Sequence, residues 1–134
     1  MTINEGLFVN AGTTLHIYCQ SYGDRMGKLI CNGASSQPGI GPKYDDDGTT
    51  HYSGHFDIHG GNIKATGGKY GAGIGGCEDR SSGTITIWDG KIEATGGTDA
   101  AGIGGGEGGS GTNTFIYGGN IKATGGDYGA GIGG

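Results

Sequence analysis

The sequence predicts an all-β fold: a right-handed parallel β-helix, or solenoid, of about four 29-residue coils with three short strands in each coil. The segment Gly-Gly-Asn-Ile-Lys-Ala-Thr-Gly-Gly at residues 60–68 recurs with few changes at 89–97 and 118–126. Each copy is followed by a second block, which is Gly-Ala-Gly-Ile-Gly-Gly at residues 71–76 and 129–134 and begins with alanine at residues 100–105. Glycine supplies 36 of the 134 residues, which disfavours helices because glycine costs about 1 kcal/mol relative to alanine in a helix. The segments repeat at a fixed period, and glycines separate their short apolar stretches. This pattern indicates a solenoid of stacked short strands.

Three strand segments are expected in each coil, because apolar residues alternate over three short stretches. A third apolar segment precedes the first block in every coil, at residues 15–18, 56–59, 85–88 and 114–117. A fainter first copy lies upstream, where residues 28–33 align with 91–96 and residues 38–41 align with 101–104.

Four inward ladders follow from this alignment, since residues one coil apart should stack at about 4.8 Å, the spacing between strands of a sheet. The ladders are Leu29/Ile63/Ile92/Ile121, Cys31/Ala65/Ala94/Ala123, Pro38/Ala72/Ala101/Ala130 and Ile40/Ile74/Ile103/Ile132.

The whole chain is expected to form one domain, residues 1–134. Its predicted parts are an N-terminal cap strand (1–13, with Leu7 and Val9 inward), coil 1 with an insertion at 19–26 (14–41), a long turn (42–55), coil 2 (56–76), coil 3 (85–105) and coil 4 (114–134). The last coil has no polar capping element, so we expect either a continuation of the natural protein or end-to-end self-association through its open strands.

Composition excludes several classes of protein. A collagen triple helix is excluded, because the sequence has only two prolines and no glycine at every third position. A net charge of −5 without a basic cluster argues against nucleic-acid binding. No apolar run is long enough for a transmembrane helix. Residues 1–6 lack the basic and apolar regions of a signal peptide, so either an upstream segment directs export or the protein stays inside the cell.

The paired glycine-rich blocks resemble repeats in large surface proteins of anaerobic Gram-positive bacteria. They are also similar to carbohydrate-binding parallel β-helix modules of plant-degrading clostridia. The resemblance covers about residues 14–134 and implies secretion or cell-surface display, polysaccharide binding, and calcium held by aspartates in the turns. The corresponding turn in this chain is Gly-Ile-Gly-Gly and carries no aspartate.

Tyr18, His59, Trp88 and Tyr117 occupy one outward position in four successive coils. Exposed aromatic rings in a row would form a glycan platform, because a ring offers a large contact area at low entropic cost. The alternative is a stacking ladder that only stabilises the edge of the solenoid. The row Asn32, Thr66, Thr95 and Thr124 is interpreted as a solvated strand face, because charged residues lie two positions away.

No cofactor is predicted, with calcium as an alternative at Asp45, Asp46 and Asp47 and in the equivalent turn at Glu78 and Asp79. The histidines at 51, 55 and 59 do not form a metal site by their spacing, because His55 and His59 would be about 13 Å apart on a strand. Three cysteines allow one bridge, and Cys19 with Cys31 is the favoured pair because both belong to the first coil.

Three functions remain open. The leading hypothesis is a secreted or cell-surface carbohydrate-binding or adhesion module, and its main alternative is a purely structural repeat that acts as a spacer or forms filaments. A polysaccharide lyase or hydrolase is less favoured. Asp57 and Asp89 could approach the separation that glycoside hydrolysis requires, but two acids on a solenoid face are common by chance.

Overall fold

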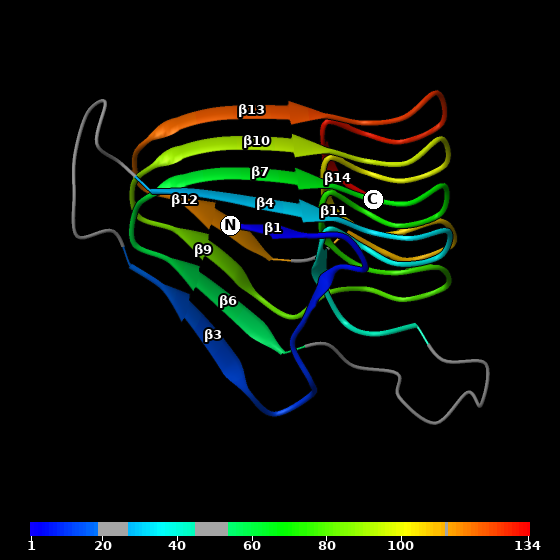
Figure 1. Cartoon of the computed structure of the whole chain (residues 1–134). Helices are drawn as coiled ribbons and strands as arrows, with labels where there is room; N and C mark the ends of the chain where they lie inside the picture. The colour runs from blue at the N-terminus through cyan, green and yellow to red at the C-terminus, as the bar shows by residue number, and fades with distance from the viewer. Residues whose placement is uncertain (19–26, 45–53, 112) are drawn as a thin grey trace.

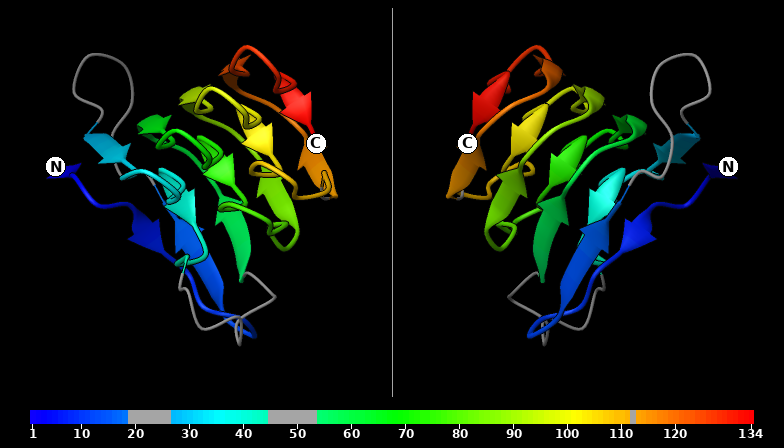
Figure 2. Two further views of the ribbon diagram at one scale, coloured as in Figure 1. Left: turned by 90° about the vertical axis from the view of Figure 1, so that its right-hand side faces the viewer. Right: turned by 90° about the vertical axis from the view of Figure 1, so that its left-hand side faces the viewer.

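A computed structural model describes residues 1–18, 27–44, 54–111 and 113–134. These residues form fourteen strands and no helix, and every strand pair is parallel. The strands lie in three sheets, each of which takes one strand from successive coils (Figure 1). The coils stack along one axis, and the two ends of the chain lie at opposite ends of the stack (Figure 2). The predicted all-β parallel solenoid of about four coils is confirmed.

The first sheet contains β1 (Thr2–Ile3), β4 (Lys28–Asn32), β7 (Asn62–Thr66), β10 (Lys91–Thr95) and β13 (Asn120–Thr124). The second sheet contains β2 (Leu7–Phe8), β5 (Ile40–Gly41), β8 (Ile74–Gly75), β11 (Ile103–Gly104) and β14 (Ile132–Gly133). The third sheet contains β3 (Thr14–Ile17), β6 (His55–Ile58), β9 (Ile85–Ile87) and β12 (Thr114–Ile116).

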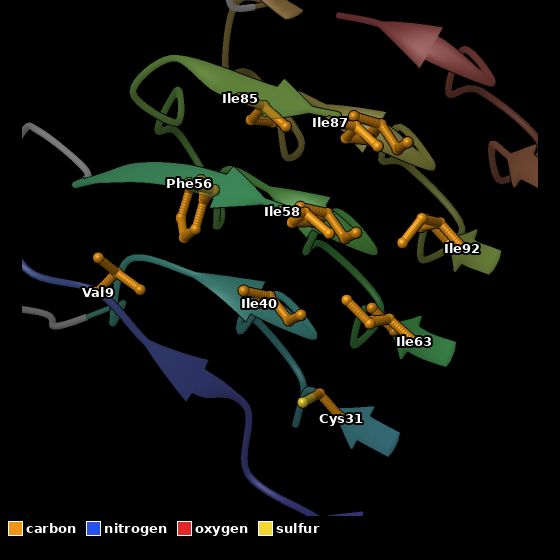
Figure 3. Packing of buried hydrophobic residues seen from close by; sticks show 13 residues of the cluster. Val9, Cys31, Ile40, Phe56, Ile58, Ile63, Ile85, Ile87 and Ile92 are labelled. Carbon is orange, nitrogen blue, oxygen red and sulfur yellow. The ribbon is translucent and has the colours of Figure 1, made fainter. Parts of the chain in front are cut away.

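The core consists of inward side chains that repeat from coil to coil (Figure 3). Ile92 pairs in register with Ile63 on one side and Ile121 on the other, and only 1% of its surface is exposed. The isoleucine row of the second sheet is also in register, with Ile103 between its neighbours in β8 and β14. The apolar ladders that strand alternation predicts are therefore present, with branched aliphatic side chains filling the centre of each coil.

The N-terminal segment differs from the predicted single cap strand. It forms two short strands in two sheets, with β1 on the edge of the first sheet and β2 on the edge of the second. Gly6 lies between them with a φ of 94°, a conformation that lets the chain turn from one sheet to the next. The segment thus begins an additional coil, which β3 completes. Val9 is buried and Leu7 packs against the core, both as expected.

The second sheet depends on a row of glycines. Gly75, Gly104 and Gly133 have φ values of 141°, 142° and 134°, which side chains with a Cβ atom rarely adopt. A Cβ atom at Gly104 would lie 1.7 Å from the carbonyl oxygen of Gly133. The close backbone approach explains why each Gly-Ile-Gly-Gly block repeats glycine at this place.

Cys31 lies in the alanine row of the first sheet, opposite Ala65, and is fully buried as a free thiol. The predicted Cys19–Cys31 bridge is therefore wrong, and Cys19 itself lies outside the described residues. Cys77 is buried as well, at the start of the turn in which the Arg80 amide donates to its carbonyl. Burial raises the pKa of the Cys31 thiol to about 11, against a smaller opposing effect of the N-terminal ammonium group.

We expect Cys31 to resist alkylation in the folded chain. A rise in pKa from 9.0 to about 11 lowers the thiolate fraction at pH 8, and the thiolate is the nucleophile. Because the folded pKa lies above the unfolded one, ionisation should destabilise the fold as the pH rises from about 9 towards 11. Peptide mapping by mass spectrometry after iodoacetamide treatment at pH 8 checks this. Equal labelling of Cys31 with and without denaturant would refute it.

Candidate functional site

The aromatic ladder consists of Tyr18, His59, Trp88 and Tyr117, the residues that directly follow the four strands of the third sheet. Backbone hydrogen bonds continue the sheet through these positions. The amides of His59, Trp88 and Tyr117 each donate to a carbonyl of the preceding coil, on Ile17, Ile58 and Ile87, at 2.8 Å. Each aromatic residue is thereby fixed one coil from the next, at the outward position that the alternation predicts.

The four rings stack face to face along the solenoid axis. Tyr18 and His59 have ring centroids 4.3 Å apart with an interplanar angle of 6°. Trp88 follows His59 at 6.2 Å and 8°, and Tyr117 follows Trp88 at 4.6 Å and 15°. The exposed fractions are 68% for Tyr18, 46% for Trp88 and 64% for Tyr117. The ring faces that lie between neighbouring members of the ladder are therefore covered.

A polar column runs beside the ladder, two residues earlier on the same outward face. It begins with His16, which pairs in register with Asp57, and Asp57 pairs with Thr86. His16 Nδ1 lies 3.4 Å from Asp57 Oδ2. Trp88 Nε1 donates a hydrogen bond to Asp57 Oδ1 at 3.1 Å, which links the polar column to the ladder.

His16 also contacts the rings of the ladder. Its ring centroid lies 5.8 Å from that of His59 and 6.2 Å from that of Tyr18. One ring nitrogen from each of His16 and His59 and one Asp57 oxygen lie within 4.8 Å of one another. Spacing along the chain does not suggest this group, because its members come from two coils. The alignment of residues 15–18 with 56–59 could have predicted the group, because it places His16 beside Asp57 in the neighbouring coil.

The other predicted ligand residues have separate surroundings. Asp45, Asp46 and Asp47 lie outside the described residues, as does His51. Glu78 accepts a hydrogen bond from the Ser36 hydroxyl, and Asp79 has a φ of 57° in the same turn.

His55 Nδ1 accepts a hydrogen bond from the amide of Thr84 at 3.0 Å. Asp89 Oδ1 accepts from the amide of Gly90 at 2.8 Å, whereas Asp57 contacts His16 and Trp88. Each of the two carboxylates considered for catalysis thus has a structural partner of its own.

The row Asn32, Thr66, Thr95 and Thr124 lies in register on the first sheet, as predicted. A salt bridge of 3.7 Å between Lys64 and Glu93 lies on the same face, and both side chains are half exposed. Charged side chains of this kind are typical of a solvated strand surface.

Comparison with known proteins supports the architecture. A family model described as a beta helix repeat matches residues 57–76, 85–107 and 116–134, which correspond to the three most regular coils. Neither the curated proteins nor the solved structures contain a match to the chain. Among the described residues, no helix has the length and apolar character needed to cross a membrane. The repeat match and the three stacked sheets together identify a parallel β-helix repeat protein.

Proposed function

We propose that this protein is a non-catalytic carbohydrate-binding module, secreted or displayed on the cell surface, that holds an extended polysaccharide along the aromatic ladder. The observation that carries the proposal is the exposure of Tyr18, Trp88 and Tyr117 along one straight face. Aromatic side chains with polar tips are well suited to ligands that combine apolar C–H surfaces with hydroxyl groups. The resemblance of the repeat blocks to carbohydrate-binding β-helix modules points the same way.

The stacking of the rings determines how a sugar would make contact. The covered ring faces are not accessible to a sugar, so contact would occur through the ring edges. The edge of an aromatic ring carries partial positive charge and attracts electron-rich atoms such as hydroxyl oxygens. The phenol groups of Tyr18 and Tyr117 and the polar atoms of His16 and Asp57 would add hydrogen bonds.

The geometry of the stack favours a ligand that is parallel to the solenoid axis. Successive coils are about 4.8 Å apart, so alternate coils are about 10 Å apart. Tyr18 and Trp88 belong to alternate coils and would contact separate units of the same chain. A long glycan can thus gain several weak contacts in series, each of which is worth little alone.

A purely structural repeat is the second candidate, and the stacked rings favour it. Each stacked aromatic pair contributes about 0.5–1.5 kcal/mol beyond area burial, so the ladder can stabilise one corner of a rigid rod. This candidate includes end-to-end self-association through the outer edges of β12, β13 and β14. Phe115, Ile116 and Ile132 on these strands are 42–50% exposed.

Removing hydroxyl groups without removing rings separates the two candidates. We expect the double variant Tyr18→Phe/Tyr117→Phe to bind a glycan selected on an array about 5- to 150-fold more weakly, because each lost hydrogen bond is worth about 0.5–1.5 kcal/mol. Its Tm should stay unchanged, since the stacked rings remain. Isothermal titration and thermal unfolding measure the two quantities.

Trp88→Ala is the matched comparison. It removes a ring that stacks on both sides, so we expect a lower Tm as well as weaker glycan binding. A parent chain that binds no glycan, while Trp88→Ala lowers the Tm, would instead support the structural repeat. If the double variant binds the glycan as tightly as the parent chain, the two hydroxyl groups do not contact the glycan.

A further inference from the structure

We propose that His16, Asp57 and His59 form a binding site for a divalent transition-metal ion of the zinc class. The three residues also belong to the proposed glycan-binding surface, but the proposal does not depend on carbohydrate binding, because its test measures a metal ion in the absence of any glycan. Two neutral imidazoles and one carboxylate are the donors that zinc, nickel and copper prefer, whereas calcium and magnesium prefer oxygen ligands alone. The nature of the ligands therefore points to a transition metal.

The fold brings the three side chains together without distortion of the backbone. His16 on β3 and Asp57 on β6 are register partners, and His59 follows two residues after Asp57 on the same face. The candidate ligand atoms lie within 4.8 Å of one another, and the His16 Nδ1 to Asp57 Oδ2 distance is already 3.4 Å. Ligands of a tetrahedral zinc ion with bonds of about 2.0–2.2 Å are separated by roughly 3.4 Å. The longest of these separations would therefore have to shorten by at most about 1.4 Å.

Two further observations indicate a ligand. His59 Nε2 is buried from solvent and has no hydrogen-bond partner among the described residues, which leaves one nitrogen of this ring unused. Asp57 is already oriented, because Trp88 Nε1 donates to its Oδ1 and leaves Oδ2 towards His16. Metal-binding carboxylates are commonly held in this way by an outer hydrogen bond.

Binding would require one local movement. The His16 and His59 rings are nearly parallel at 24°, and nitrogen lone pairs lie in the ring plane, so the two rings do not point at a common centre. His16 is 46% exposed and can turn about its side-chain bonds towards Asp57 and His59. We therefore expect metal binding to move the His16 ring away from the rings of Tyr18 and His59 while the backbone stays in place.

The single tryptophan of the chain provides the test. Trp88 donates to Asp57 and stacks on His59, so its fluorescence should respond to an ion bound at these residues. We expect titration of the full chain with zinc chloride to change the fluorescence until one equivalent of zinc is bound. Nickel chloride should compete for the same site, and calcium chloride should produce no change.

Ligand variants decide whether the response comes from this site. His16→Gln and His59→Gln should each raise the Kd for zinc at least about 10-fold, as loss of a ligand or its support typically does. His55→Gln is the matched control, because His55 lies on the same strand as Asp57 but uses its Nδ1 for the Thr84 amide. Unchanged zinc affinity in both ligand variants, or an equal loss in the control, would overturn the proposal. No zinc-dependent fluorescence change in the parent chain would overturn it as well.

Discussion

Replacing Ile92 with aspartate should unfold the chain. Ile92 is 1% exposed and lies between Ile63 and Ile121 in the core of the first sheet. A carboxylate at this position would be buried between two apolar side chains without a partner, at a cost of several kcal/mol. Domains of this size are stable by only about 5–15 kcal/mol, so a single buried charge removes much of that margin.

Circular dichroism and thermal unfolding measure this effect. Ile92→Asp should lose the β-sheet spectrum or unfold at a much lower temperature. Thr95→Asp is the control on the same strand, because Thr95 lies in the outward row, and its Tm should change little. Equal stability of the two variants would contradict the inward position of Ile92.

Gly104→Ala should produce the second largest loss of stability, although it adds only one methyl group. The new Cβ atom would lie 1.7 Å from the Gly133 carbonyl oxygen, and the φ of 142° is unfavourable for alanine. Backbone strain of this type costs about 1–3 kcal/mol, and the clash adds to it. We expect an overall loss of about 3 kcal/mol or more, equivalent to a fall in Tm of roughly 10 °C.

Alanine variants at two other glycines distinguish the cost of backbone strain from the cost of the steric clash. Gly12 also has a positive φ, 75°, but nothing lies near its added Cβ atom, so Gly12→Ala should show the strain alone. Gly27 has open space and no unusual φ, so Gly27→Ala should leave the Tm nearly unchanged. A Gly104→Ala variant as stable as the parent would contradict the close packing of successive coils in the second sheet.

The stacked core was predictable because the repeat carries it directly. A step of 29 residues places isoleucine over isoleucine and alanine over alanine, and parallel strands in register keep those rows together. The N-terminal segment was not predictable in the same way. Its strands β1 and β2 have two residues each and lack the repeated blocks, so alternation alone could not separate two strands from one.

The site was predictable in position but not in geometry. Alternation placed Tyr18, His59, Trp88 and Tyr117 outward, and their backbone hydrogen bonds confirm the common register. Ring orientation depends on side-chain torsions, which sequence patterns do not encode, so the covered ring faces became evident only from the structure. The juxtaposition of His16 with Asp57 and His59 was missed because the histidines were compared by their spacing along the chain, whereas these ligands come from neighbouring coils.

Nuclear magnetic resonance titration of the labelled chain with an array-selected oligosaccharide tests the proposed function most directly. We predict chemical-shift changes at Tyr18, Trp88 and Tyr117 and at adjacent residues of the third sheet, and none along the threonine row of the first sheet. Shift changes concentrated on the first sheet, or no change with any glycan, would contradict the assignment of the aromatic ladder as a carbohydrate-binding surface.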